Sequence, residues 1–271
     1  MTPIYPMFEN RYRSIWLSDI HLGYRGCKAE YLLDFLQTVE CERLYLVGDI
    51  VDIWSMKKSL YWPSSHSDVL RAIFDKARAG TQVIYVPGNH DEALRDYDGM
   101  LFGNIKVRKN HLHTTADGRR MLIMHGDEFD SVIQCSRLVS LIGCISYDVL
   151  LYINRMLNHL RRRLGFSYWS LASFLKSRVG SAMQHVNNFE KAAVYEAQRH
   201  AAQGVICGHI HHAEAREIDG ILYCNTGDWV ENCTALVEKQ DGGIELLHWT
   251  EQKSCLKSIT PDEFDINRKV A

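Results

Sequence analysis

Short apolar runs rich in β-branched residues alternate along the chain with segments of helical periodicity. The runs 15–17, 44–47, 83–86, 121–124 and 205–207 each end in a polar or turn residue, which is typical of buried strands. The segments 28–39 and 67–79 carry apolar residues at three- and four-residue intervals and therefore predict helices. Asp-Gly pairs at 117–118, 219–220 and 241–242 predict hairpin turns.

Strands that alternate with helices and are followed by hairpins predict an α/β fold of two packed mixed β-sheets flanked by helices. At 271 residues the chain is long enough to bury a large core. We expect a single domain over residues 11–251 that includes a helical insert, or lid, over 131–199. The polar, unpatterned segment 252–271 predicts a loosely ordered C-terminal tail.

Composition narrows the class of protein. Apolar residues make up 46% of the chain and charged residues 24%, as in ordinary globular proteins. The net charge of -2 argues against a protein that coats nucleic acid, and we expect no nucleic-acid partner. The first 14 residues lack the apolar core of an export signal, and the eight cysteines form no Cys-x-x-Cys pair. We therefore expect a reduced, cytoplasmic chain.

Each of the five predicted strands runs directly into residues of the kind that bind metal ions. These residues are Asp19, His21, Asp49, Asn89, His125, His209 and His211. Ligands of open α/β sheets bind beyond the carboxyl ends of the strands, so we expect these side chains at one edge of one sheet. Carboxylate, amide and imidazole ligands together suit Mn²⁺, Zn²⁺ or Fe better than the all-oxygen sites of Ca²⁺ or Mg²⁺. The pattern predicts a site for two ions, with Mn²⁺ expected first.

Taken one at a time, these motifs differ in specificity. The segments 19–21 and 48–52, each on its own, are more often surface turns than ligand pairs. The segment 88–91 is more specific, and 208–212 more specific again, because closely spaced histidines after an apolar run rarely serve packing. All five in one chain make coincidence a poor explanation.

In this order the motifs resemble those of the calcineurin-like metallophosphoesterases. That pattern of Asp-x-His, Gly-Asp-x-x-Asp, Gly-Asn-His-Asp/Glu, a single His and Gly-His-x-His is complete here from Asp19 to His211. The resemblance implies that one metal ion is held by Asp19, His21, Asp49 and His211. It implies that a second ion is held by Asp49, Asn89, His125 and His209, with Asp49 bridging the two.

The resemblance also implies catalytic roles. His90 would lie over the leaving-group oxygen, oriented by Asp52, and an ordinary histidine pKa near ~6.5 suits proton donation. Two ions that share a carboxylate would acidify a bridging water to a hydroxide, which attacks the phosphorus. Asp91 and Asp127 have no ligand position. We expect them either to accept hydrogen bonds from ligating imidazoles or to be ordinary turn carboxylates.

Within that superfamily, the layout from residue 14 to 249 resembles the UDP-2,3-diacylglucosamine pyrophosphohydrolases of lipid A synthesis. The shared features are the segment 125–127, the helical insert and the segment 208–211. Many members of that branch carry Arg after the Asn, where this chain has His90. The implied substrate is a UDP-linked acylated sugar. The alternatives are a general metallophosphoesterase of soluble nucleotides or phosphodiesters, and a scaffold without catalysis.

The insert has its own chemistry. Residues 131–189 include seven basic residues and one acidic residue. This segment therefore carries a charge of +6, whereas the net charge of the whole chain is -2. Its apolar residues follow helical spacing, but the uncharged stretch 138–147 is too short to cross a bilayer. The apolar stripe either packs into the core or meets lipid and acyl chains.

Basic side chains in the insert are the candidates for contact with substrate phosphate or anionic lipid. They are Arg161, Arg162, Arg163, Lys176 and Arg178. The triple arginine followed by aromatic residues suits a membrane interface, although a solvated charge run is the equal alternative. We expect a small-molecule or glycolipid phosphate as substrate and an anionic inner-membrane surface as a peripheral partner. The sequence leaves the oligomeric state open.

Overall fold

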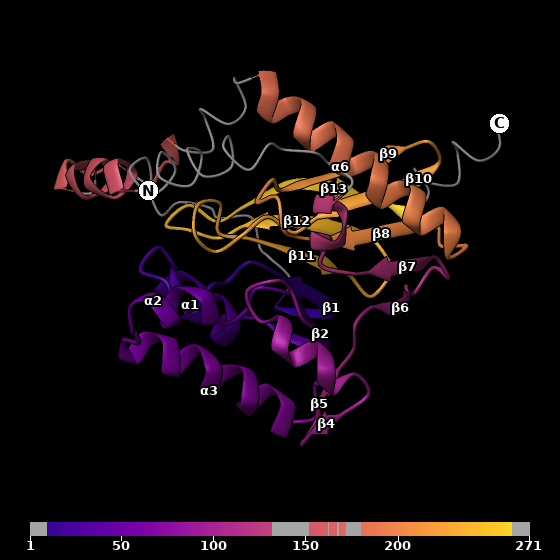
Figure 1. Cartoon of the computed structure of the whole chain (residues 1–271), viewed down its shortest axis with the longest axis horizontal. Coiled ribbons are helices and arrows are strands. Elements are labelled where there is room, and N and C mark those ends of the chain that lie inside the picture. The colour runs from indigo at the N-terminus through magenta and orange to yellow at the C-terminus, as the bar shows by residue number, and fades with distance from the viewer. Residues whose placement is uncertain (1–9, 132–151, 162, 167, 172–179, 262–271) are drawn as a thin grey trace.

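Two β-sheets pack face to face, and helices cover the outer face of each, as the computed structural model shows (Figure 1). The structure describes residues 10–131, 152–161, 163–166, 168–171 and 180–261. The sequence prediction of an α/β fold with two packed mixed sheets is confirmed.

The first sheet has eight strands and the second has five. In spatial order the first is β13 (Ser254–Ile259), β12 (Ile244–His248), β11 (Thr234–Glu238), β1 (Arg11–Leu17), β2 (Glu40–Val47), β3 (Gln82–Val86), β5 (Ile105–Val107) and β4 (Leu101–Phe102). The second is β6 (His111–Thr114), β7 (Arg120–Ile123), β8 (Gly204–Cys207), β10 (Ile221–Asn225) and β9 (Glu214–Ile218). The centres of both sheets are parallel, β1-β2-β3-β5 and β7-β8-β10, and the outer strands are antiparallel.

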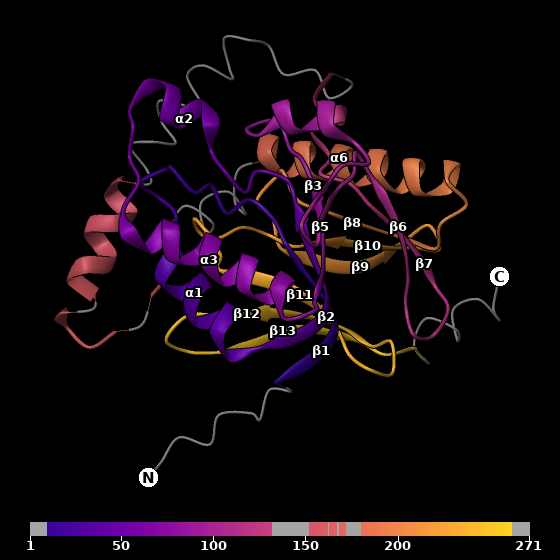
Figure 2. The same ribbon diagram turned by 90° about the horizontal axis from the view of Figure 1, so that it is seen from below.

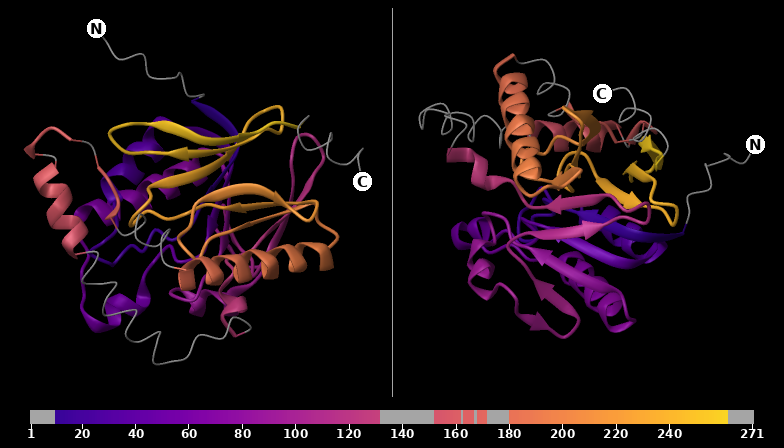
Figure 3. Two further views of the ribbon diagram at one scale, coloured as in Figure 1. Left: turned by 90° about the horizontal axis from the view of Figure 1, so that it is seen from above. Right: turned by 90° about the vertical axis from the view of Figure 1, so that its right-hand side faces the viewer.

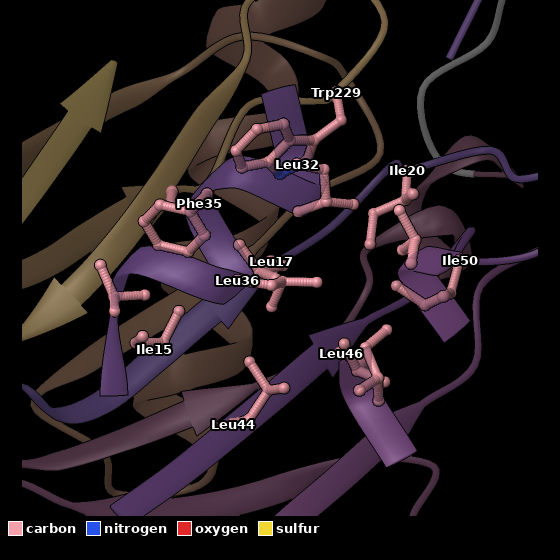
Figure 4. Packing of buried hydrophobic residues seen from close by; sticks show 14 of the residues in the cluster. Ile15, Leu17, Ile20, Leu32, Phe35, Leu36, Leu44, Leu46, Ile50 and Trp229 are labelled. Carbon is pink, nitrogen blue, oxygen red and sulfur yellow. The ribbon is translucent and has the colours of Figure 1, made fainter. Parts of the chain in front are cut away.

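Helices α1 (Ala29–Thr38) and α3 (Ser64–Arg78) lie side by side on the outer face of the first sheet (Figure 2). Side chains alternate along each strand because successive residues point to opposite faces. Ile15 and Leu17 therefore pack outward against α1, where Phe35 is fully buried (Figure 4). Trp16 points inward and stacks on Tyr45, with ring centroids 5.5 Å apart, in the layer between the sheets.

Helix α6 (Gly180–Arg199) covers the outer face of the second sheet (Figure 3). Phe189, Ala193 and Ala197 are buried against Leu122 and Tyr223 of that sheet. The insert 131–199 was expected to be a lid as a whole. Its last 20 residues are instead a core layer of the fold, because their apolar stripe has a sheet to cover.

A second helical piece of the insert, over residues 152–161, lies at the same end of the molecule as α2 (Ile53–Lys58) (Figures 1 and 2). Its buried side chains are polar, Asn154 and Asn158, whereas four of its five large apolar side chains are exposed and Leu157 is partly buried. The exposed ones are Tyr152, Ile153, Met156 and Leu160. The expectation that the apolar stripe packs into the core is therefore wrong for this helix.

Other predictions were met or corrected. The three Asp-Gly turns join β6 to β7, β9 to β10 and β11 to β12, as expected. The expected loose tail contains β13, which pairs with β12, so that expectation is wrong for Ser254–Ile259. The short elements α2, β4, β5, η1 (Glu92–Tyr97) and η2 (Asp127–Ser131) escaped sequence analysis because they are too short to show a period. Within the described ranges, no helix is both long and apolar enough to cross a bilayer.

If α6 is a core layer, truncation of its buried face will destabilise the whole domain. We expect Phe189→Ala to lower the free energy of unfolding by about 3–5 kcal/mol, because it leaves a cavity under the helix. Tyr195→Ala on the same helix is the matched control: that side chain is 64% exposed, and its loss is expected to cost less than about 0.5 kcal/mol. Urea unfolding followed by circular dichroism measures both, and equal effects would contradict the assignment.

Candidate metal centre

The predicted ligands stand in loops that follow five strands, three from the first sheet and two from the second. Asp19 follows β1, Asp49 follows β2 and Asn89 follows β3 in the first sheet. His125 follows β7 and His209 follows β8 in the second. The expectation of a single sheet edge is therefore wrong in detail, because the strands with these motifs are divided between two sheets. Face-to-face packing brings the carboxyl ends of both sets together.

The backbone reverses sharply at these residues. Five of the eight non-glycine residues with positive φ in the described chain are predicted ligands. They are Asp19 (49°), His21 (54°), Asp49 (54°), His209 (71°) and His211 (51°). Each such conformation costs on the order of 1–2 kcal/mol for a residue with a Cβ. Such strain persists only where surrounding structure enforces it, and here hydrogen bonds from the Asp19 and His21 amides to the carbonyls of Gly48 and Asp49 do so.

Among the described residues, three overlapping groups of side chains could each hold an ion. In each group one ligand atom per residue lies within 4.8 Å of the others. The groups are Asp19 with His21 and His211, Asp49 with Asp19 and His125, and Asp49 with His21 and His90. His211 Nε2 lies 3.2 Å from Asp19 Oδ1, and His125 Nε2 lies 3.5 Å from Asp49 Oδ2. Asp19, His21 and Asp49 each belong to two groups, so these three side chains connect the groups into one centre.

Lone pairs without hydrogens to accept mark where cations fit. Asn89 Oδ1 and His125 Nε2 are both shielded from water and have no hydrogen-bond partner among the described residues. A buried polar atom left without a partner is costly, and a divalent cation is a partner that Asn89 Oδ1 can bind directly and His125 Nε2 can bind once it has lost its proton. His125 Nδ1 donates to the Val47 carbonyl at 2.9 Å, which leaves Nε2 as the metal-facing nitrogen. The residues present therefore fit divalent cations.

His209 differs from the other predicted ligands. Its ring lies 5.2 Å from that of His125, but its Nε2 is 2.8 Å from Asp130 Oδ1. The Asp19 carboxylate accepts a hydrogen bond from the His209 amide, so the loop is tied to the centre through its backbone. The structure thus places His209 beside the ligand cluster with its imidazole paired to a carboxylate from η2.

Glycines allow the loops to approach one another. A Cβ at Gly88 would lie inside van der Waals contact of Asp49 Oδ1 and the His125 ring. A Cβ at Gly208 would meet the Asp19 carboxylate in the same way. The Gly-Asn and Gly-His pairs of the motifs therefore have a steric reason: any larger residue would push the ligands apart.

His90 and Asp52 form a pair at the rim of the centre. His90 Nδ1 lies 2.9 Å from Asp52 Oδ1, and the other Asp52 oxygen is 3.1 Å from His21 Nδ1. Asp52 also caps α2 by accepting from the Ser55 amide at 2.7 Å. One carboxylate thus orients both a predicted ligand and the predicted proton donor. The Trp54 ring lies against His90, with centroids 4.6 Å apart.

Of the two alternatives expected for Asp91 and Asp127, the structure favours turn carboxylates, because neither accepts a hydrogen bond from a predicted imidazole ligand within the described part of the chain. Asp91 accepts from the Ile50 amide at 2.8 Å, from the Gly88 amide and from the Tyr85 hydroxyl, and it ties the loop after β3 to the loop after β2. Asp127 pairs with Arg95 at 2.6 Å. Both are turn carboxylates that fix loops.

Sequence analysis missed two carboxylates near the ligands, Asp130 and Asp228. Asp228 Oδ2 lies 3.8 Å from His211 Nδ1, and its other oxygen accepts from the Val230 amide at 2.7 Å. The signal for Asp228 was present, because Gly227-Asp228 follows the apolar run of β10 just as Gly48-Asp49 follows β2. Asp130 lies in η2 and carries no comparable signal.

In the metal-free protein, neighbouring carboxylates and imidazoles shift one another's pKa values. Burial opposes charge on His21, but its hydrogen bond to Asp52 and the charges of Asp49 and Asp19 raise its pKa to about 9. Burial likewise opposes charge on His125, and Asp49 and Asp19 raise its pKa to about 10. Burial works against the Asp19 charge too, but His211 lowers the pKa of Asp19 to about 2.

The amino-acid sequence matches a known protein family that fits this geometry. The family model described as calcineurin-like phosphoesterase matches residues 12–213, which include all five ligand loops. The chain belongs to the calcineurin-like phosphoesterase family. Members use divalent metals, and this chain is accordingly a metal-dependent hydrolase of the phosphoesterase class.

Curated relatives and a solved structure agree with this family. A UDP-2,3-diacylglucosamine hydrolase of Haemophilus influenzae (strain PittGG) is 21% identical over 247 residues, covering 85% of this chain and 96% of the relative. A protein of the same name from Azotobacter vinelandii is 25% identical over 227 residues, covering 80% and 90%. The phosphoesterase YfcE of E. coli has the same fold. Its structure matches with a TM-score of 0.50 at 14% identity, covering 91% of this chain and 98% of YfcE.

The raised pKa values of His21 and His125 lead to a test. At pH 7.5 both imidazoles of the metal-free phosphoesterase are protonated, since the pH lies below pKa values of about 9 and 10. A metal ligand must be neutral, so Mn²⁺ binding will release about two protons per chain, and affinity will rise with pH. Calorimetric titration in buffers of different ionisation enthalpy measures the release. His21→Gln should remove one proton and the exposed control His159→Gln none; no release in the wild type would contradict the geometry.

Proposed function

We propose that this chain cleaves the pyrophosphate bond of a UDP-linked acylated sugar similar to UDP-2,3-diacylglucosamine, with two divalent metal ions. Mn²⁺ is the expected ion, with Zn²⁺ or Fe as alternatives, because the ligands mix carboxylate, amide and imidazole. The first ion would be held by Asp19, His21, Asp49 and His211. The second would be held by Asp49, Asn89, His125 and His209. Ions bound there would supply Lewis-acid stabilisation of phosphoryl charge and acidify a water nucleophile.

The chain itself contributes proton transfer and orientation. Asp52 holds His90 through Nδ1, so Nε2 is the nitrogen available to a substrate. A protonated His90 would donate to the departing oxygen, and the Asp52 carboxylate would stabilise the resulting distribution of charge. Asp52 also fixes the His21 imidazole, so the orientation of the proton donor is coupled to that of a ligand.

The helix over residues 152–161, which buries polar side chains and exposes apolar ones, is the observation that supports an acylated substrate. It buries Asn154 and Asn158 and exposes four large apolar side chains. Arg155 Nη2 donates to the carbonyl of Arg25 at 2.8 Å, four residues beyond His21, so this helix packs on a metal-centre loop. Further exposed apolar residues follow it at Leu164 and Phe166. An apolar surface beside a phosphoesterase centre suits a substrate with acyl chains.

The basic residues beside this surface support a membrane partner. Arg161 lies over the rings of Phe166 and Trp169, at 5.5 and 5.9 Å from their centroids. Guanidinium groups beside exposed aromatic rings suit the interface of an anionic bilayer. Arg163 is part of the same segment, whereas Arg162, Lys176 and Arg178 lie outside the described residues or side chains. We propose a cytoplasmic protein that binds peripherally to the inner membrane. The names of the relatives from Haemophilus and Azotobacter support the same substrate class.

The alternative is a phosphoesterase of soluble nucleotides or phosphodiesters. His90 favours it, since many UDP-diacylglucosamine pyrophosphohydrolases carry Arg at this position. A soluble substrate, however, gives no physical reason for the exposed apolar side chains on the helix over 152–161. The two candidates therefore differ in whether acyl chains change turnover.

Removal of His90 is expected to separate binding from chemistry. His90→Ala should lower kcat by about 10²–10⁴-fold with metal content unchanged, because a positioned proton donor contributes that much. The loss should shrink for p-nitrophenyl esters, whose leaving group needs no proton. His159→Ala, an exposed histidine of the insert, is the control and should keep wild-type activity. An equal loss of kcat on good and poor leaving groups would show that His90 only positions the substrate.

Acyl dependence tests the proposed substrate. UDP-2,3-diacylglucosamine should exceed its unacylated analogue in kcat/KM by orders of magnitude, since each buried CH₂ contributes about 0.8 kcal/mol. Met156→Ser with Leu160→Ser should remove most of that preference and weaken binding to anionic vesicles. The control Phe74→Ser with Leu112→Ser changes exposed apolar residues elsewhere and should do neither. Equal turnover of both substrates, with good turnover of a cyclic nucleotide, would favour the soluble-substrate alternative.

A further inference from the structure

A cleft lies beside the amino-terminal halves of β2 and β3, whereas the metal centre follows the carboxyl ends of these strands. It has a volume of about 460 Å³ and opens beside β2, β3, β5 and β6. Strand β2 links the two sites: from Arg43 in the cleft to Asp49 in the metal centre is six residues, or at most about 20 Å at about 3.3 Å per residue. In Figure 1, β6 lies at the right of the molecule and α2, which follows the metal-centre loop, at the left.

The cleft is basic. Its lining residues are Arg43, Tyr45, Gly80, Thr81, Gln82, Val83, Ile84, Leu101, Asn104, Lys106 and His111. Three of these can carry positive charge and none carries a carboxylate. We call this group of Arg43, Lys106 and His111, with the cleft they line, the Arg43 niche.

Strand register explains why the three basic residues meet. Arg43 is opposite Gln82 and Lys106 is opposite Ile84 in the first sheet, and both are on the face turned toward the second sheet. His111 comes from β6 of the second sheet, and its ring lies 5.7 Å from that of Tyr45. The first sheet therefore contributes both cations of this space, and the second sheet contributes the imidazole beside them.

The charges of the niche have no acidic partner in the described part of the chain. Neither Arg43 nor Lys106 has a carboxylate oxygen within 4.0 Å there, although Arg13, Arg95 and Arg119 each do. Arg43 Nη1 is shielded from water and makes no hydrogen bond to any described residue. A shielded guanidinium nitrogen without an acceptor is costly, so an anion is the natural complement.

The pKa of His111 reflects the positive charges of the niche. Burial and the positive charges of His113, Arg108, Lys106 and Arg43 all lower its pKa, to about 4. His113 also pairs with Glu238 at 2.9 Å, and Arg108 lies 3.9 Å from Asp98, so these two have carboxylates of their own. Arg43 and Lys106 remain as the cations that can serve a ligand.

We propose that the Arg43 niche binds the phosphate group of a small phosphorylated molecule, at a site separate from the metal centre. A guanidinium and an ammonium match a dianion, and the planar guanidinium can bind two phosphate oxygens at once. Tyr45, Ile84 and Leu101 offer apolar walls for an organic group attached to the phosphate. The volume suits a nucleotide or sugar phosphate rather than a polymer.

Histidine NMR on the full-length protein provides a local readout. We expect inorganic phosphate, unlike chloride at equal ionic strength, to raise the pKa of His111 by about one unit, because a bound anion offsets the surrounding cations. His111 is opposite Ile123, two residues before the predicted ligand His125, so the Arg43→Gln, Lys106→Gln variant described below is needed to separate phosphate in the niche from phosphate at the metals. Uridine monophosphate and glucose 1-phosphate are further arms, and tighter binding of one over free phosphate identifies the source of the phosphate group.

Variants make the test specific. Arg43→Gln with Lys106→Gln should weaken phosphate binding at least tenfold and leave hydrolase activity and metal content unchanged. Arg108→Gln, whose guanidinium faces Asp98, is the matched control and should stay within about twofold of wild type. Lys106→Gln alone serves if the double variant unfolds. No change in the His111 pKa with phosphate, or an equal change with chloride or in the double variant, would overturn the proposal.

Discussion

The carboxylate of Asp49 is where the two sheets meet electrostatically. It lies 3.8 Å from His21 of the first sheet and 3.5 Å from His125 of the second, and it accepts the His90 amide at 2.8 Å. Burial would favour the neutral acid, but the histidines around it hold the pKa of Asp49 far below its ordinary value. The left-handed backbone at Asp49, the glycine that faces it at position 88 and the packing of the sheets all serve this position.

Face-to-face packing has consequences at both ends of the sheets. At the carboxyl ends of the parallel strands it gathers acids and imidazoles into one centre. At the amino-terminal ends of β2 and β3 it places the imidazole of His111 from the second sheet beside Arg43 and Lys106 of the first. Between the two lies an apolar layer around Trp16 and Tyr45, which keeps the sites apart and the strands in register. The fold therefore creates opposite electrostatic environments from one arrangement of strands.

Many of the strands and helices, and the candidate ligand residues, could be identified from the sequence. Strand ends and helices were found because apolar periodicity and closing glycines are local signals, and α1 and α3 began and ended near their predicted limits. The predicted ligands came from five strand ends, and the structure places these strand ends at two facing sheet edges. The division of those strands between two sheets was missed, because periodicity does not say which strands pair. The role of Asp130 was missed as well, since its contact with His209 spans 79 positions along the chain.

The insert over residues 131–199 shows most clearly where prediction from sequence fails. Its stripe of apolar residues predicted burial, yet Asn154 and Asn158 face inward and Met156 faces out. The asparagines are satisfied there by the Trp169 backbone, its carbonyl 2.7 Å from the Asn158 amide, and by the Leu171 amide 2.8 Å from Asn154 Oδ1. Sequence patterns assume that polar groups prefer water, so a helix held by side-chain amides inverts the prediction. That inversion supports the proposal of a substrate with acyl chains.

We propose that Asp49 joins two metal shells. Elemental analysis of the protein after equilibration with Mn²⁺ and gel filtration tests it directly. The account predicts two ions per chain in the wild type, none in Asp49→Ala, and about one in His211→Ala, with the surface variant Asp75→Ala equal to wild type. At most one ion per chain in the wild type, or full occupancy in Asp49→Ala, would contradict it.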